Sequence, residues 1–294
     1  MKFGAIFPSC EIGNDPSVIR DWAQAAEELG YSHILAYDHV LGGVREDRDP
    51  PMLSAYDNRN PFHEPFVLLA YLAGLTSTIE LATSVLVLPQ RQTALAAKQA
   101  AELAVLSGGR LRLGVGSGNN YVEYDCLGAS FEDRGRMLDE QVEVLRKLWG
   151  DSVVDFTGDF HRIDRAGVAP QPPTQIPIWF GGRSVAALRR AAAVGDGFIF
   201  SPAADPIKEF CRQLTADLDA NGRREGFGID VLTGFGDGPD HWHREIAAWE
   251  ALGADSLSMR TMSTSSMMFG EKDPGFTKPQ EHIAALKAFM LEVQ

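Results

Sequence analysis

The stretch "IELATSVLVLPQRQTALAAKQAAELAVLSGGRLRLGVG", residues 79–116, holds two apolar segments separated by an alanine-rich one. Residues 79–87 and 110–116 are rich in Leu and Val, which is typical of buried strands. Residues 94–106 predict a helix, and the Ser-Gly-Gly that follows is a usual helix stop. Parallel strands need such a helical crossover, so this stretch predicts one βαβ unit.

The same alternation extends in both directions along the chain. The predicted strands are residues 2–7, 32–37, 79–87, 110–116, 176–180, 196–201, 228–235 and 255–259. The predicted helices are residues 16–29, 65–74, 94–106, 131–149, 184–194, 206–220, 241–251 and 279–293, with short hairpin strands within 153–163. Eight strands, each followed by a helix, favour an α/β fold of one (β/α)8 TIM barrel over residues 1–294, rather than a doubly wound sheet.

Composition excludes several classes of partner. A formal net charge of −13 over 294 residues argues against nucleic acid and anionic membranes, which attract clustered Lys and Arg. The longest apolar runs are shorter than the ~20 residues that a membrane helix needs. Too few apolar residues precede Pro8 to form the apolar region of a signal peptide. We therefore expect a cytoplasmic protein.

Cysteine and histidine spacing points to no metal site. Cys10, Cys126 and Cys211 stand singly, and His241 and His243 lack the spacing that places two ligands on one helix face. We expect reduced, incidental cysteines and no bound metal.

The carboxyl ends of the strands carry the chemistry in such a barrel. Asp38 and His39 follow the second strand, where the alternative is a solvated surface turn. Residues 42–63 form a long loop after them, read as a lid or as a disordered segment. A similar loop, residues 260–278, follows the eighth strand. Its Met262, Met267, Met268 and Phe269 either floor a substrate pocket or form a loop tip.

Three further strand ends suggest a bound planar ligand. "GVGSGNN", residues 114–120, lets the backbone approach a ligand closely. "ATSVLVLPQR", residues 82–91, lines a ring-binding floor or is barrel core, with Arg91 adding positive charge. Gly181 to Ser184 combine a helix start with Arg183, which indicates a phosphate site; the alternative is a tight, capped turn.

These strand ends, in this order, resemble the luciferase-like monooxygenase superfamily. The branch most similar is the deazaflavin (coenzyme F420) dependent oxidoreductases, and the likeness covers nearly the whole chain. It implies a barrel that binds its cofactor at the mouth. The positions it implies for cofactor binding are Asp38, His39, Thr83, Ser84, Val85, Gly116, Ser117, Gly118, Asn119, Gly181, Gly182, Arg183 and Ser184.

The resemblance also implies roles within this set. His39 exchanges a proton or holds the substrate during hydride transfer, and Asp38 is the second catalytic candidate. A neighbouring carboxylate would favour charged His39 and orient its ring. Ser84–Val85 matches a non-proline cis peptide. The chain differs from the pattern of the family at two positions. Sugar-phosphate dehydrogenases carry an acidic residue at the position of Ser117, and many relatives have Trp at the position of Asn119.

The function expected on this basis is an oxidoreductase that moves hydride between coenzyme F420 and a small organic substrate. The alternative is an FMN-dependent two-component monooxygenase that uses oxygen and a separate reductase. Asp38-His39, in place of the Glu-His-His more frequent in FMN-using relatives, favours deazaflavin. A non-catalytic flavin or deazaflavin carrier is the alternative of another class. The resemblance further suggests a homodimer.

Overall fold

The computed structural model describes residues 1–52, 54, 56–201, 205–264 and 266–294. Its strands are β1 (Lys2–Ile6), β2 (His33–Ala36), β3 (Glu80–Thr83), β4 (Leu86–Val87), β5 (Leu111–Gly116), β6 (Val154–Thr157), β7 (Arg162–Ala166), β8 (Ile178–Gly181), β9 (Gly197–Phe200), β10 (Gly228–Gly234) and β11 (Ser256–Arg260). Its α-helices are α1 (Pro16–Glu28), α2 (Pro65–Ala73), α3 (Thr93–Leu106), α4 (Tyr121–Cys126), α5 (Arg134–Gly150), α6 (Val185–Val194), α7 (Asp205–Ala220), α8 (Pro239–Ala251) and α9 (Pro279–Val293). Short 3-10 turns are η1 (Leu88–Gln90), η2 (Phe235–Asp237) and η3 (Ser266–Phe269).

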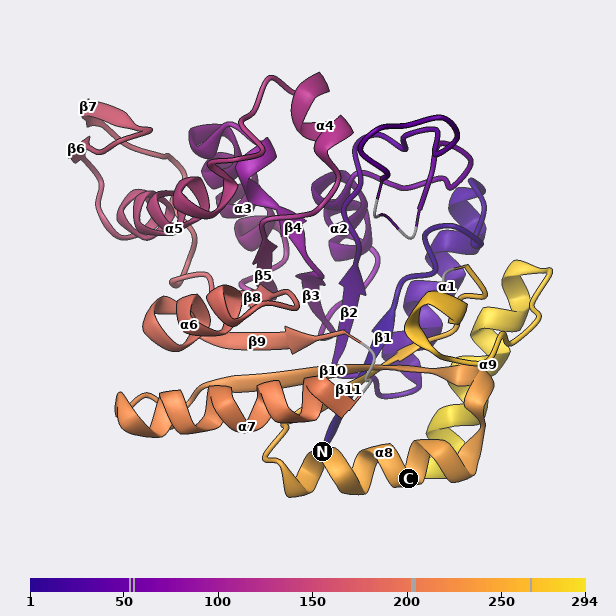
Figure 1. The fold of residues 1–294 in the computed structure, drawn as a ribbon. Helices are drawn as coiled ribbons and strands as arrows, with labels where there is room; N and C mark the ends of the chain where they lie inside the picture. The colour runs from indigo at the N-terminus through magenta and orange to yellow at the C-terminus, as the bar shows by residue number, and fades with distance from the viewer. Residues whose placement is uncertain (53, 55, 202–204, 265) are drawn as a thin grey trace.

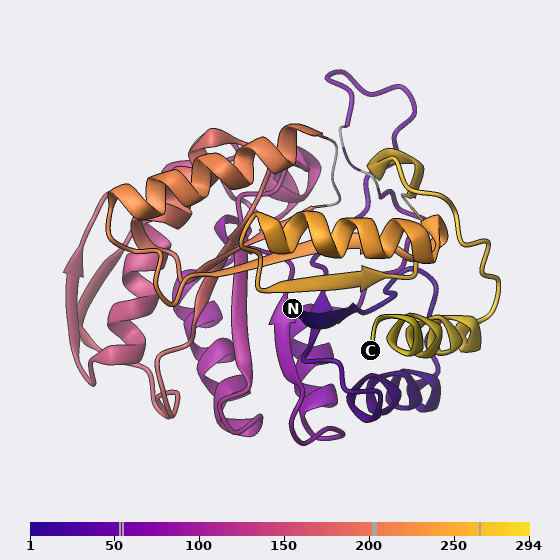
Figure 2. The same cartoon turned by 90° about the horizontal axis from the view of Figure 1, so that it is seen from below.

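The parallel strands close into a barrel, which confirms the predicted (β/α)8 fold (Figure 1). Their order is β3-β2-β1-β11-β10-β9-β8-β5-β4, and pairing of β3 with β5 closes the ring. The helices lie around the outside, with α9 beside α1 in the view from below (Figure 2). Among the described residues, none of the helices has the length and apolar character needed to cross a bilayer.

One predicted strand is broken in two. β3 and β4 together occupy residues 79–87, and the interruption falls at Ser84–Val85, whose peptide bond is cis as the resemblance implied. β6 and β7 form the predicted antiparallel hairpin.

Helix starts follow local sequence signals in most places. The Asp15 side chain accepts a hydrogen bond from Ser17 N and caps α1, and Ser184 caps α6 through Ala187 N. The helix expected from residue 131 begins instead at Arg134, and a further short helix, α4, is inserted after β5.

The barrel interior is polar at its floor, the end where the strands begin. His33, Arg112 and Ser258 surround the fully buried Asp230, with His33 Nε2 2.8 Å and Ser258 Oγ 2.9 Å from its carboxylate. Burial raises the pKa of Asp230, but the charges of His33 and Arg112 and the hydrogen bonds from His33 and Ser258 outweigh burial and hold the pKa below its usual value. An apolar layer follows above: Ile6, Leu35, Ala82, Ile199 and Leu232.

Close backbone contact makes Gly114 a stability determinant. A Cβ on Gly114 would lie 2.0 Å from Thr83 O, a backbone atom that cannot move aside. We expect Gly114→Ala to lower the free energy of unfolding by about 1–3 kcal/mol or more, as overpacking does. Gly74→Ala is the control, because its nearest neighbour would be 3.6 Å away and its φ of −75° suits alanine. Urea denaturation measures both; equal stabilities would contradict the predicted clash.

Candidate active site

A buried carboxylate holds His39 at the mouth of the barrel. His39 Nδ1 lies 3.1 Å from Oε1 of Glu123, whose side chain is 1% exposed. Gln90 Nε2 donates to the other oxygen of Glu123 at 3.0 Å. Burial raises the pKa of Glu123, but the hydrogen bonds from His39 and Gln90 outweigh burial and leave the pKa below its usual value. An ionised Glu123 requires Nδ1 to be the donor, so Nε2 is the ring nitrogen that faces a reaction partner.

The Asp38 carboxylate contacts other groups than His39. Its carboxylate accepts from Arg91 Nη2 at 2.8 Å and from Val87 N at 2.9 Å, and it is almost fully buried. The carboxylate that contacts His39 is therefore Glu123 and not its sequence neighbour. The physical reason is that Arg91 and the backbone N–H of Val87 already bind the Asp38 carboxylate. Asp38 instead ties the end of β2 to β4.

The loop of residues 42–63 covers His39. The ring centroid of His39 lies 5.2 Å from that of Tyr56 and 4.7 Å from that of Phe62. Tyr56 is buried, and Tyr121 on α4 donates to Pro50 O at 2.8 Å. Figure 1 shows this loop beside α4. A small pocket remains here, lined by His39, Val40, Gly42, Tyr56, Asp57, Asn60 and Phe62.

Glycines border a platform at the broken strand. A Cβ on Gly116 would come within 2.5 Å of Val85 Cγ2, and one on Gly181 within 2.7 Å of Val85 Cγ1. Val85 is half-buried against the barrel interior. Thr83 supports the platform from behind, since it is fully buried and its hydroxyl donates to Gly114 O. The absence of side chains at these two glycines leaves room beside Val85, which would suit the ring of a flavin-like cofactor.

The residues after β5 have mainly structural contacts. Gly118 has a φ of +59°, and a Cβ there would meet Val87. Ser117 O accepts a hydrogen bond from the Tyr124 hydroxyl at 2.7 Å, which anchors α4. Asn119 has a bonding partner as well.

The start of α6 has features expected of an anion-binding turn. Gly182, Arg183 and Ser184 are exposed, so the first backbone N–H groups of the helix are open to a ligand. Arg183 Nε donates to Ser201 Oγ at 2.8 Å, and its guanidinium lies 5.3 Å from the ring centroid of Phe269. This positive turn fits the phosphate of a flavin or deazaflavin tail.

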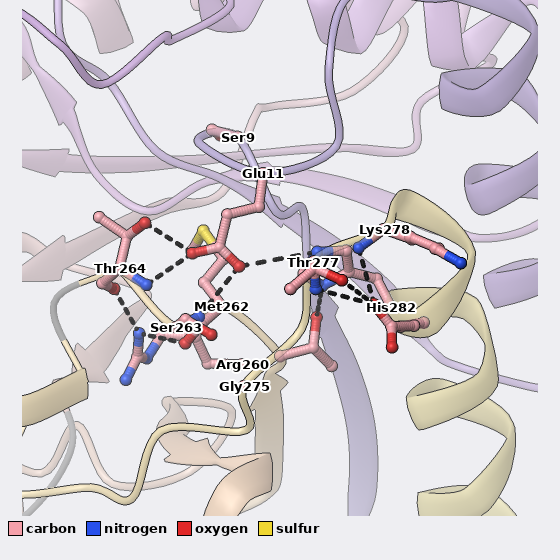
Figure 3. Close-up of polar contacts among 12 residues, drawn as sticks. Ser9, Glu11, Arg260, Met262, Ser263, Thr264, Gly275, Thr277, Lys278 and His282 are labelled. Carbon is pink, nitrogen blue, oxygen red and sulfur yellow. Dashed lines mark hydrogen bonds and ion pairs between the residues drawn. The ribbon is translucent and has the colours of Figure 1, made fainter.

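The loop after β11 is hydrogen-bonded to the loop after β1. Glu11 accepts from the backbone N of Ser263 at 3.0 Å and of Thr264 at 2.6 Å, and His282 lies nearby (Figure 3). Met262 is buried in the barrel interior and Phe269 is half-buried. The side chains of Met267 and Met268 lie outside the described residues.

Two functional candidates were missed in the sequence. Glu123 follows Asn120 by three residues, the spacing of a helix cap and its third residue, and this signal predicts the start of α4. Asn120 does cap α4, through Val122 N. Arg260 at the end of β11 had no local signal of its own.

The sequence model of the luciferase-like monooxygenase family matches residues 1–269. The chain belongs to the luciferase-like monooxygenase family. An uncharacterized protein of Mycobacterium tuberculosis in the comparison is 38% identical over 216 residues, which cover 72% of this chain and 75% of that protein. An F420-dependent glucose-6-phosphate dehydrogenase of Kineococcus radiotolerans is 28% identical, over 81% of this chain and 69% of its own.

Solved structures support the luciferase-like fold. Monooxygenase RslO1 from Streptomyces bottropensis superposes with a TM-score of 0.78 at 20% identity, covering 100% of this chain and 98% of its own. The coenzyme F420 dependent tetrahydromethanopterin reductase from Methanopyrus kandleri superposes with a TM-score of 0.75 at 14% identity, over 99% and 98%. The relatives thus include F420-dependent oxidoreductases and monooxygenases on one barrel.

Proposed function

We propose that this protein is an oxidoreductase that transfers hydride between coenzyme F420 and a small organic substrate. The observation that carries the proposal is the His39–Glu123 pair, which lies at the mouth of a barrel that also bears a glycine-bordered platform and an anion-binding turn. F420-dependent dehydrogenases among the relatives support it.

The bound deazaflavin would supply the hydride chemistry, and the protein would supply position and protons. Val85, with Gly116 and Gly181 beside it, would support the ring, while the start of α6 and Arg183 would hold the phosphate. Glu123 fixes the His39 ring through Nδ1, so that Nε2 can give or take the substrate proton. Tyr56 and Phe62 limit access of water to that nitrogen.

An FMN-dependent monooxygenase with a separate reductase is the second candidate. Likenesses to RslO1 and to the pyrimidine monooxygenase RutA of Escherichia coli, 32% identical over 53% of this chain and 47% of that protein, favour it. A non-catalytic carrier is the weaker alternative, because it leaves the buried partner of His39 without a purpose.

Titration of the purified apo-protein with F420 and, in parallel, with FMN tests the cofactor. We expect F420 to bind at least tenfold more tightly, followed by fluorescence and absorbance. Arg183→Gln should weaken F420 binding, because it removes the cation at the anion-binding turn. Arg212→Gln, an exposed arginine on α7, is the control. Tighter binding of FMN would instead favour the monooxygenase.

The remaining assignments are proposals of the same kind. We propose a small-molecule substrate, a homodimer and a cytoplasmic location, and a reductase partner only if FMN is the cofactor. Sedimentation velocity of the purified chain tests the dimer.

A further inference from the structure

The end of β11 carries a buried ion pair that the reaction described above does not use. The side chain of Arg260, the last residue of β11, is 1% exposed and pairs with Glu271, 7% exposed, in the loop that follows. A Cβ on Gly234 would come within 2.5 Å of the Glu271 carboxyl carbon. Glu271 therefore folds back from its loop onto the end of the barrel.

The pair leaves one edge of the guanidinium incompletely bonded. Arg260 Nη1 donates to Met262 O at 3.1 Å and Thr264 O at 2.9 Å (Figure 3), and Nη2 donates to Glu271 Oε2. Within the described residues, Arg260 Nε and Glu271 Oε1 have no hydrogen-bond partner, although both atoms are buried. The Nε and Nη2 edge of an arginine matches the two oxygens of a carboxylate. Glu271 thus makes one bond to an edge that can make two.

Arg260 lies within electrostatic range of Tyr37. Burial raises the pKa of Tyr37, and the positive charge of Arg260 acts in the opposite direction. The ring centroid of Tyr37 is 6.4 Å from that of Tyr56, which is 5.2 Å from that of His39. Tyr37 is therefore the side chain that relates Arg260 to the residues around His39.

Aromatic contact also connects Arg260 with the anion-binding turn. The guanidinium of Arg260 lies 5.1 Å from the ring centroid of Phe269, and that of Arg183 lies 5.3 Å from the same ring. Both guanidinium groups thus lie beside one phenyl ring, which places Arg260 near the turn at the start of α6.

We propose that Arg260 binds the carboxylate of an organic-acid substrate, and that Glu271 occupies this position until the substrate displaces it. The reaction of that substrate rests on the proposed function, whereas its binding does not. A free carboxylate, unlike one restrained by the chain, can accept from both Nε and Nη2. A neutral ligand that displaced Glu271 would leave Arg260 buried without a counter-ion, so the pair selects against uncharged substrates.

Benzoate, with benzamide as its uncharged analogue, tests the proposal without cofactor. Titration calorimetry at constant ionic strength is expected to show benzoate binding at least tenfold more tightly to Glu271→Gln than to wild type. Benzamide should show no such gain. Glu209→Gln, the same charge change at an exposed residue of α7, is the matched control and should bind benzoate as wild type does.

Two double variants decide the role of Arg260. Arg260→Gln/Glu271→Gln should lose the gain in benzoate affinity. If Glu271→Gln does not fold, the charge-free Arg260→Met/Glu271→Met variant replaces it, and it should lose the weak binding that wild type shows. Equal affinity of wild type and Glu271→Gln, or binding that survives loss of Arg260, would overturn the proposal. Preference for inorganic phosphate over benzoate would overturn the carboxylate assignment.

The proposed function is tested by a separate measurement, the titration with F420 and FMN. The benzoate titrations contain no cofactor, so a protein that binds neither F420 nor FMN can still show the Arg260 response. Conversely, tight F420 binding with no benzoate response would remove the organic-acid class alone.

Discussion

Replacing His39 by alanine is expected to lower kcat by about 10²–10⁴-fold, the usual contribution of a positioned proton-transfer group. The cofactor Kd should change little, because the platform at Val85 and the turn at Arg183 remain. Steady-state kinetics, together with F420 titration of the same variant, separates the two effects once a substrate is known.

The control for this experiment is His161, a histidine outside the candidate active site. His161 also contacts a glutamate, with Nδ1 2.7 Å from Glu140 Oε1, but this pair joins the β6–β7 hairpin to α5. His161→Ala should therefore retain kcat. Unchanged turnover and unchanged cofactor affinity in His39→Ala would remove His39 from the mechanism.

Glu123→Gln is expected to lower kcat by about 10- to 100-fold, the loss typical when the partner that orients a histidine is removed. Glutamine can still accept from His39 Nδ1, but it lacks the negative charge of the carboxylate. The F420 Kd of the same variant should change little, so that the loss falls on kcat. Glu140→Gln is the matched control and should leave kcat unchanged.

The same variant has a defined effect on acid stability. The pKa of Glu123 is lower in the folded protein than in the unfolded chain. Its stabilising contribution is therefore complete above the usual glutamate pKa and is lost as pH falls through the lower folded value. Thermal denaturation from neutral to acid pH should show this loss in wild type and a smaller one in Glu123→Gln. Identical pH dependence in both would contradict the assigned pKa direction.

Local signals predicted the elements of this fold well. Asp15 and Ser184 cap helices because a side-chain oxygen next to free backbone N–H groups is a property of a few adjacent residues. The alternation of apolar strands and helices along the sequence predicted eight strand–helix units. This number favoured a closed barrel. The short helix α4 was overlooked although Asn120 and Glu123 have the spacing of a helix start.

The side-chain contacts in the candidate active site could not be predicted from the sequence. The partner of His39 is 84 positions away, and nothing near His39 in the chain marks it. Asp38 is adjacent in sequence but pairs with Arg91, which is 53 positions away. The Arg260–Glu271 pair depends on how the loop after β11 folds back onto the barrel. The spacing of apolar residues in the sequence does not predict this conformation.

The polar floor of the barrel has a consequence for strand alignment. Asp230 on β10 meets His33 from β2, Arg112 from β5 and Ser258 from β11. A shift of β10 by one residue would turn Asp230 outward among apolar helix contacts and turn its apolar neighbours toward three polar groups. Such a shift would thus bury charge without a partner. We expect this layer to disfavour a one-residue slip of β10, at the end of the barrel farthest from the chemistry.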